Sequence, residues 1–162
     1  MKIYALQGDS GTGKTTTLKL LYCLFLQEYP NAQILYCKHS RSILKDLSAA
    51  DVLRETEEER KNPNRIKNLT VVLSVNGRVA GICTYGDGCK RLREGCDTFK
   101  KWNCDAAFTA LHFSRAMETC LKSYDPSAEF ICKELAAGEE EQLRVNKKQA
   151  EELLSLCRKM LS

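Results

Sequence analysis

Residues 2–20 read KIYALQGDSGTGKTTTLKL, and this stretch decides the fold prediction. Gly8, Gly13, Lys14 and Thr15 stand at the spacing G-x-x-x-x-G-K-[ST]. The residues just before the first glycine form a short apolar run typical of a strand, and those after the lysine continue as a strongly apolar helix. A strand, a glycine-rich turn and a helix in this order predict a phosphate-binding loop.

The residue types of this turn suit an anionic ligand. Glycines allow positive φ angles, so consecutive backbone N–H groups can approach phosphate oxygens closely. The helix begins inside the loop, which directs its free N–H groups and the positive end of its dipole at the same place. Lys14 adds a charge for the β- and γ-phosphates and is a catalytic candidate, while the Thr15 hydroxyl is an oxygen ligand that Mg²⁺ accepts. The alternative is a glycine turn with a coincidental Lys-Thr pair.

On these residues the chain resembles the P-loop NTPase superfamily, and its Walker A element in particular. The resemblance implies an α/β fold with a three-layer P-loop NTPase sheet, mostly parallel with one antiparallel hairpin, and helices on both faces. It also places Thr16 near the α-phosphate. The residues expected to bind the nucleotide are Gly8, Asp9, Ser10, Gly11, Thr12, Gly13, Lys14, Thr15 and Thr16.

A hairpin is the clearest local prediction after the loop. Two β-rich runs, 69–75 and 78–85, flank the pair Asn76-Gly77, which favours a tight antiparallel turn. The second run ends in Gly-Asp-Gly, and an acidic residue beyond an apolar strand can hold Mg²⁺ directly or through water. Asp87 is therefore the Walker B candidate, a metal and catalytic residue; alternatively it is only a turn residue.

Other parts of the chain predict a ligand-facing edge less specifically. A strand over 33–37 is followed by His39 and Arg41, which lie where open α/β sheets bind ligands or else in a solvated loop. Residues 46–68 are highly charged and form either a mobile flap over the nucleotide or an exposed helix and loop; we favour the exposed form. Asp105 stands at the start of its strand and ranks below Asp87.

Helices and strands account for the remainder. A basic helix over 90–101 precedes the strand CDAAFTAL, a helix covers 117–124, and an edge strand covers 129–133. The last helix begins at Glu139, with acidic residues at its start, basic residues near its end and an apolar face that belongs to the core. The chain of 162 residues is long enough for a single domain, 1–162.

Bulk composition limits partners and compartment. A net charge of +4 suits an anionic ligand but does not indicate nucleic acid. No leader or membrane-length apolar run is visible, so we expect a cytoplasmic protein without a membrane partner. The nine cysteines contain no C-x-x-C pair, which argues against a disulfide framework or a zinc knuckle. Cys89 and Cys96 lie among basic residues and are candidates for reactive thiols.

The layout GICTYGDG, basic helix, CDAAFTA is also similar to a group of small, poorly characterised bacterial P-loop proteins. The chain departs from that group because His112, not arginine, follows the CDAAFTA strand. The candidates for a catalytic arginine are accordingly Arg41, Arg91, Arg93 and Arg115.

Two functions from different classes follow. The first is Mg²⁺-dependent hydrolysis or transfer of the γ-phosphoryl group to an unknown acceptor. The second is a binding or regulatory module controlled by the nucleotide, with an unknown protein partner and little turnover. The hairpin before Asp87 resembles the GTPase-like branch of the superfamily. ATP is nevertheless favoured over GTP, because Asn146-Lys147-Lys148-Gln149 lacks the aspartate of the guanine-reading N-K-x-D motif and lies in a helix.

Overall fold

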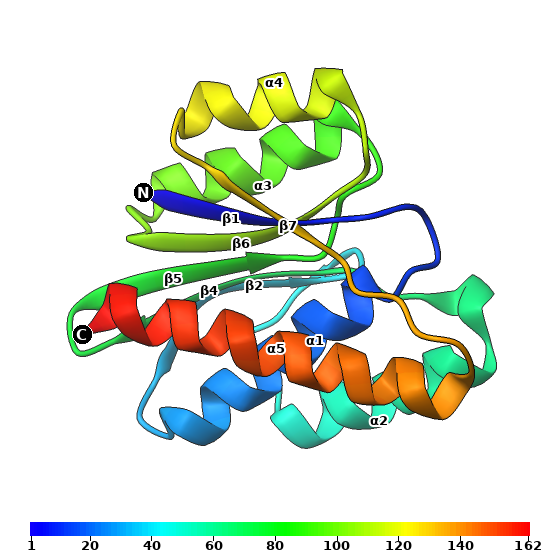
Figure 1. Cartoon of the computed structure of the whole chain (residues 1–162). Helices are drawn as coiled ribbons and strands as arrows, with labels where there is room; N and C mark the ends of the chain where they lie inside the picture. The colour runs from blue at the N-terminus through cyan, green and yellow to red at the C-terminus, as the bar shows by residue number, and fades with distance from the viewer.

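The fold is a seven-stranded sheet with helices on both faces (Figure 1). The computed structural model describes all residues from Met1 to Ser162. In chain order the elements are β1 (Lys2–Gln7), α1 (Lys14–Glu28), β2 (Gln33–His39), β3 (Ser42–Ile43), α2 (Ala49–Lys61), η1 (Pro63–Arg65), β4 (Leu69–Val75), β5 (Arg78–Cys83), α3 (Cys89–Lys101), β6 (Ala106–Leu111), α4 (Arg115–Tyr124), β7 (Glu129–Cys132) and α5 (Glu139–Leu161).

The sheet is mixed, and the expectation of a mostly parallel P-loop NTPase sheet with one antiparallel hairpin is wrong. The strand order is β3-β2-β4-β5-β6-β1-β7. The pairings β5–β6, β6–β1 and β1–β7 are parallel, whereas β3–β2, β2–β4 and β4–β5 are antiparallel. A strand–helix–strand pattern usually indicates a crossover to a parallel neighbour. Here the chain leaves β2 and enters β4 at the same edge of the sheet, so α2 is not a crossover.

The predicted hairpin is confirmed. β4 and β5 pair antiparallel from Thr70 with Cys83 to Val75 with Arg78. Asn76 and Gly77 both have positive φ, 51° and 77°, which is the geometry of a type I′ turn. The turn residues therefore fix the register of this half of the sheet.

Alternating side chains of the strands supply two separate cores. On one face, Tyr4 and Leu6 of β1 belong to a cluster with α1 and α5. On the other face, Ile3 and Ala5 belong to a cluster with α3 and α4. Figure 1 shows α3 and α4 covering one face while α1, α2 and α5 cover the other. No helix combines the length and the apolar character needed to cross a bilayer.

Candidate functional site

The turn between β1 and α1 has the backbone geometry of an anion-binding loop. Gly11 and Gly13 adopt positive φ angles of 75° and 89°. Gly13 caps α1 without any side-chain hydrogen bond, and the first turn of the helix contains no acidic residue. The first N–H groups of α1 therefore have no partner from a capping side chain, and an anion would satisfy them.

Lys14 lies across this turn. Its ammonium group donates hydrogen bonds to the carbonyl oxygens of Gly8 and Asp9, each at 2.6 Å. Thr12 also donates its hydroxyl to the Asp9 carbonyl, at 2.8 Å. Burial lowers the pKa of Lys14, and nearby Asp9 opposes this shift. Main-chain carbonyls carry only partial charge, so a phosphate group would be a stronger acceptor for the same ammonium.

A second lysine stands behind the turn. Lys133 follows β7, and its Cβ lies 3.0 Å from the position of an ideal Cβ on Gly8, so the first glycine allows a close approach of the two segments. The Lys133 ammonium donates to the carbonyl of Glu134 at 2.7 Å. Burial lowers the pKa of Lys133 to about 8, and the charge of Lys14 adds to this effect. The loop is therefore backed by a buried cation that the sequence motif does not include.

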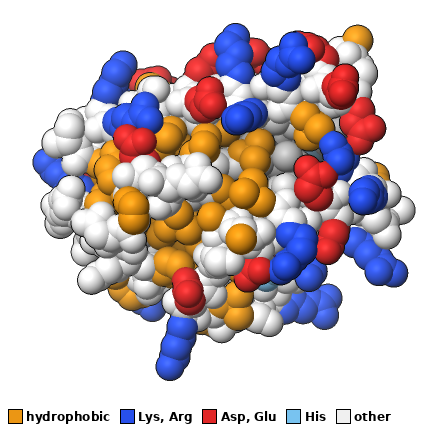
Figure 2. Space-filling model, turned by 90° about the horizontal axis from the view of Figure 1, so that it is seen from below, with side chains coloured by type: hydrophobic (Ala, Val, Ile, Leu, Met, Phe, Trp, Pro, Cys, Tyr) orange, Lys and Arg blue, Asp and Glu red, His pale blue; other side chains and the backbone are white.

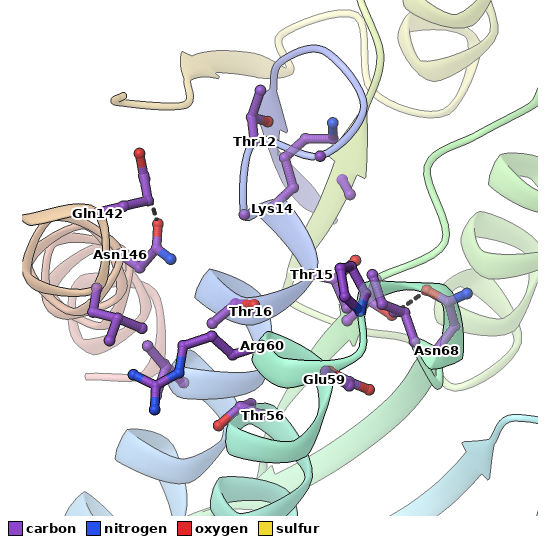
Figure 3. A pocket seen from close by; sticks show the side chains of 18 of the residues that line it. Thr12, Lys14, Thr15, Thr16, Thr56, Glu59, Arg60, Asn68, Gln142 and Asn146 are labelled. Carbon is purple, nitrogen blue, oxygen red and sulfur yellow. Dashed lines mark hydrogen bonds between the residues drawn. The ribbon is translucent and has the colours of Figure 1, made fainter. Parts of the chain in front are cut away.

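The loop opens onto a large cavity of about 890 Å³. Seven consecutive residues of the turn and the first part of α1, Ser10 to Thr16, line it, whereas the predicted contacts Gly8 and Asp9 do not. Its other walls come from α2, η1, the segments after β5 and β6, and the first turns of α5 (Figure 3). Leu20, Leu53 and Leu143 give it an apolar part, and Figure 2 shows hydrophobic side chains gathered on the face formed by α1, α2 and α5. The cavity thus joins a phosphate-sized cradle to an apolar region.

Asp87 lines the same cavity as Thr15. Neither the Asp87 carboxylate nor the Thr15 hydroxyl forms a hydrogen bond within the protein. Gly86 next to it is required by packing, because a Cβ there would lie 2.6 Å from the backbone of Ala110. The connection after β5 therefore passes directly over the end of β6, which separates β5 from β1 in the sheet.

The donor set would suit a magnesium ion that takes most of its ligands from phosphates and water. No group of three or more His, Cys, Asp or Glu side chains is placed to hold a metal. Thr15 and Asp87, which line the same cavity, would supply one hydroxyl and one carboxylate oxygen. Mg²⁺ commonly keeps several waters and takes its other ligands from phosphates, so two protein oxygens are sufficient.

Helix α5 carries a buried polar stripe that sequence reasoning missed. An ideal Cβ on Gly13 would lie 3.0 Å from the side-chain amide of Asn146, so this amide packs directly on the loop. Gln142 donates to the Asn146 oxygen at 2.9 Å, as drawn in Figure 3. Gln149 binds the segment after β7, accepting from Glu134 N at 3.1 Å and donating to Cys132 O at 2.7 Å. The sequence does contain a signal for this stripe. The side-chain amides of Gln142, Asn146 and Gln149 are spaced at i, i+4 and i+7, which places them on one side of the helix next to its apolar face.

Helix α2 is attached to α1 by a buried charge cluster. Lys19, which is only 1% exposed, contacts Glu55 and Glu59 at 2.5 Å each. His39 pairs with Glu55 at 2.7 Å, so this predicted ligand residue is used elsewhere and does not line the cavity. Burial raises the pKa of Glu59 despite the contact with Lys19. One Glu59 oxygen, Oε2, is buried without a hydrogen-bond partner.

The segment 46–68 is more than an exposed helix and loop. Leu53, Thr56, Glu59 and Arg60 from α2 line the cavity, followed by Pro63, Ile66 and Asn68. This region therefore forms one wall of the candidate site. The prediction of an exposed helix and loop holds for most of the segment, since α2 buries only Val52, Thr56 and Glu59, but it did not include the cavity wall.

Several other candidate residues lie away from the cavity. None of the proposed arginines lines it; the two arginines that do, Arg54 and Arg60, both belong to α2. His112, the residue found in place of an expected arginine, does line it. Asp105 binds the backbone of Val79 at 2.9 Å at the start of β6, which is a structural role.

Burial keeps the thiol of Cys96, a candidate reactive cysteine, in its neutral form. Cys96 packs between α3 and the sheet, and burial raises its pKa to about 12. The prediction of a reactive thiol is wrong for Cys96, because a neutral buried thiol is a poor nucleophile. Cys89 is partly exposed, and its reactivity stays a prediction.

Comparison of the chain with protein-family models, with curated proteins and with solved structures found no match. The resemblance to P-loop NTPases therefore stays a prediction that depends on the loop residues themselves.

Proposed function

We propose that the protein binds a nucleoside triphosphate, preferentially ATP, with Mg²⁺ and hydrolyses or transfers its γ-phosphoryl group. The observation that carries the proposal is the open glycine turn at the start of α1. It combines two positive-φ glycines, an uncapped helix and a lysine, and it faces a cavity of about 890 Å³. Backbone N–H groups in this arrangement bind phosphate oxygens.

Each candidate residue has a defined part in this proposal. The amides of the turn hold the phosphates, and the Lys14 ammonium turns from the Gly8 and Asp9 carbonyls to the β- and γ-phosphates. Thr15 and Asp87 would hold Mg²⁺, directly or through water, and the bound ion would supply positive charge beside the phosphates. The apolar part of the cavity near Leu20 and Leu143 suits the base.

ATP is the preferred nucleotide in this proposal because the chain has no N-K-x-D motif. Asn146 is 4% exposed, lies inside α5 and packs against Gly13. Its amide is therefore already used to support the loop, and Gln149 binds Cys132 and Glu134. Neither residue is free to recognise guanine.

Nucleotide binding is tested by Lys14→Ala. MgATP at a hundredfold excess over its Kd should stabilise the parent protein by about 2.7 kcal/mol, and this stabilisation should vanish in the variant. Thermal unfolding with and without MgATP measures the difference for each protein separately, so any intrinsic effect of the substitution cancels. Lys100→Ala, an exposed change on α3, is the control and should keep the full stabilisation. Equal stabilisation of Lys14→Ala and the parent would refute the loop assignment.

A second candidate function, a nucleotide-controlled binding module, is supported by two observations. None of the four candidate arginines lines the cavity, and the two arginines that do, Arg54 and Arg60, are ion-paired with Asp51 and Glu57 of their own helix, so no unpaired guanidinium faces a transferred phosphoryl group. Next to the cavity residue His112, Phe113 is 57% exposed, which suits contact with a protein partner.

Asp87→Asn distinguishes the two functions. Under the enzyme proposal, the variant should still be stabilised by ATP but should lose Mg²⁺-dependent phosphate release by roughly a hundredfold or more. If the parent shows binding but negligible release, the module is the better account. Full activity of the variant would assign the metal role to another acidic residue.

A further inference from the structure

A second, smaller cavity lies at the same edge of the sheet as the phosphate-binding loop. Its volume is about 390 Å³, and the residues that line it are Lys38, Ser40, Arg41, Tyr85, Lys90, Arg91 and Glu94. They come from the end of β2, the turn into β3, the segment after β5 and the first turns of α3. β2 and β5 both pair antiparallel with β4, so their carboxyl ends meet at one edge.

Unpaired positive charge distinguishes this cavity. Four of its seven lining residues are Lys or Arg, and Glu94 is the one acidic residue among them. None of these four cations is within 4.0 Å of a carboxylate, although eleven ion pairs occur elsewhere in the protein. Four cations against one carboxylate leave an excess of positive charge in the cavity, so an anion at this place would be stabilised.

Tyr85 gives the cavity a fixed framework. Its hydroxyl donates a hydrogen bond to the carbonyl of Ser40 at 2.9 Å, which joins the turn after β2 to the segment after β5. The Arg91 guanidinium lies over the Tyr85 ring, 5.1 Å from its centroid. Two of the walls and one of the cations are therefore positioned without a ligand.

The start of α3 adds a second reason to expect an anion. Gly88 caps this helix without a side-chain hydrogen bond, and the first turn contains no acidic residue. Instead it contains Lys90 and Arg91, the opposite of the charge that the helix dipole favours at an N-terminus. A bound anion would offset the unfavourable charge of these two side chains, both of which line the cavity.

We propose that this cavity binds the phosphate group of a second small-molecule ligand, separate from the nucleotide at Lys14. Its volume is at the lower end of the range of small-molecule sites, roughly 300–1,000 Å³. The segment 84–91 lines both cavities: Thr84, Gly86 and Asp87 face the first, while Tyr85 and Arg91 face the second. The second ligand would therefore lie beside the segment that carries Asp87. The proposal does not depend on nucleotide hydrolysis.

The test is a titration with inorganic phosphate followed by amide NMR, with ionic strength held constant by chloride. The two sites report separately, since loop binding shifts the Gly13 and Lys14 amides. Phosphate in the second cavity should produce saturable shifts at Ser40 and Cys89. The double variant Arg41→Gln/Arg91→Gln should weaken this second binding by roughly tenfold for each guanidinium removed and leave the loop shifts unchanged.

The matched control is Lys100→Gln/Lys101→Gln, which removes the same charge from the exposed far end of α3. It should keep the parent affinity at Ser40 and Cys89. Shifts that stay linear in phosphate, or equal losses in both double variants, would overturn the proposal. Titration with a short single-stranded oligonucleotide tests whether the phosphate comes instead from a nucleic-acid backbone. If the oligonucleotide binds more tightly than phosphate and both double variants weaken it equally, the cations form a diffuse polyanion surface, and the small-molecule site is rejected.

Discussion

The helices α5 and α2 both wall the loop cavity, but they are attached to the protein in different ways. α5 is anchored by apolar residues, Leu153, Leu154 and Cys157 among them, and its polar stripe has hydrogen-bond partners. α2 buries only Val52, Thr56 and Glu59. Its charged attachment to α1 is the contact of Lys19 with two carboxylates, one of which keeps an unpartnered buried oxygen.

This difference bears on how a ligand could act. A close-packed apolar face resists displacement because its contacts are lost over short distances, whereas a buried ion pair depends on every member keeping its partner. The α5 wall therefore supports the loop in one fixed position. We expect the α2 wall, which buries few residues and has one unpartnered carboxylate oxygen at its attachment, to be the side of the cavity that a bound ligand displaces more easily.

The substitution with the largest expected effect removes the charged attachment of α2 to α1. Lys19→Met leaves Glu55 and Glu59 buried without their cation and should lower the free energy of unfolding by about 3–5 kcal/mol. Urea denaturation measures the loss. The triple variant Lys19→Met/Glu55→Gln/Glu59→Gln should recover most of it, because no uncompensated charge remains. A loss below about 1 kcal/mol in Lys19→Met would show that the cluster contributes little to holding α2.

The charge cluster of Lys19, Glu55 and Glu59 could be predicted only in part from the sequence. Lys19 lies in the apolar run of α1, and Glu55 and Glu59 are four residues apart in a highly charged segment. Periodicity places the two carboxylates on one face of a helix. It does not say that α2 turns this face toward α1, because a charge run is usually solvated. That orientation depends on the return of the chain to β4 at the same edge of the sheet.

The loop and the hairpin were predictable for the opposite reason. Gly11, Gly13 and the pair Asn76-Gly77 act through their own backbone angles, so their structure is encoded locally. Strand direction is not local. The runs that became β2 and β4 have the composition of strands in either direction, and the mixed sheet follows from which edge each connection reaches. Asn146 was missed because its contact with Gly13 joins positions far apart in the chain.

The second largest expected effect tests whether the α5 wall holds the loop in a fixed position. Gly13 and Gly138 both have positive φ, 89° and 85°, and both cap helices. Gly138→Ala should cost about 1–2 kcal/mol of unfolding free energy from backbone strain alone, since nothing lies within 4 Å of the added Cβ. Gly13→Ala should cost more, because its Cβ would lie 3.0 Å from the hydrogen-bonded amide of Asn146.

A double-mutant cycle identifies the source of the extra cost at Gly13. In an Asn146→Ala background, Gly13→Ala should become less costly by about 0.5–3 kcal/mol, the range seen for residues in contact. Gly138→Ala should be unaffected by the same background, because Gly138 does not touch Asn146. An unchanged cost at Gly13 would mean that α5 gives way, and the contrast between a fixed and a movable wall would fail.

The smallest expected effect concerns the one ion pair that joins the two walls. Arg60 of α2 contacts Glu139 of α5 at 3.3 Å and Glu57 of its own helix at 2.5 Å. Both acidic partners are mostly exposed, so Glu139→Gln should change the free energy of unfolding by less than about 1 kcal/mol. Glu57→Gln, which removes a contact within α2, is the matched control and should behave similarly.

Measuring Glu139→Gln with and without Arg60→Gln isolates the coupling energy between α2 and α5 across the cavity, and repeating the measurement at high salt should reduce this coupling. A coupling above about 2 kcal/mol would mean that α2 is fastened to α5 and not to α1 alone. In that case the two walls would move together, and the charge cluster at Lys19 would no longer decide the position of α2.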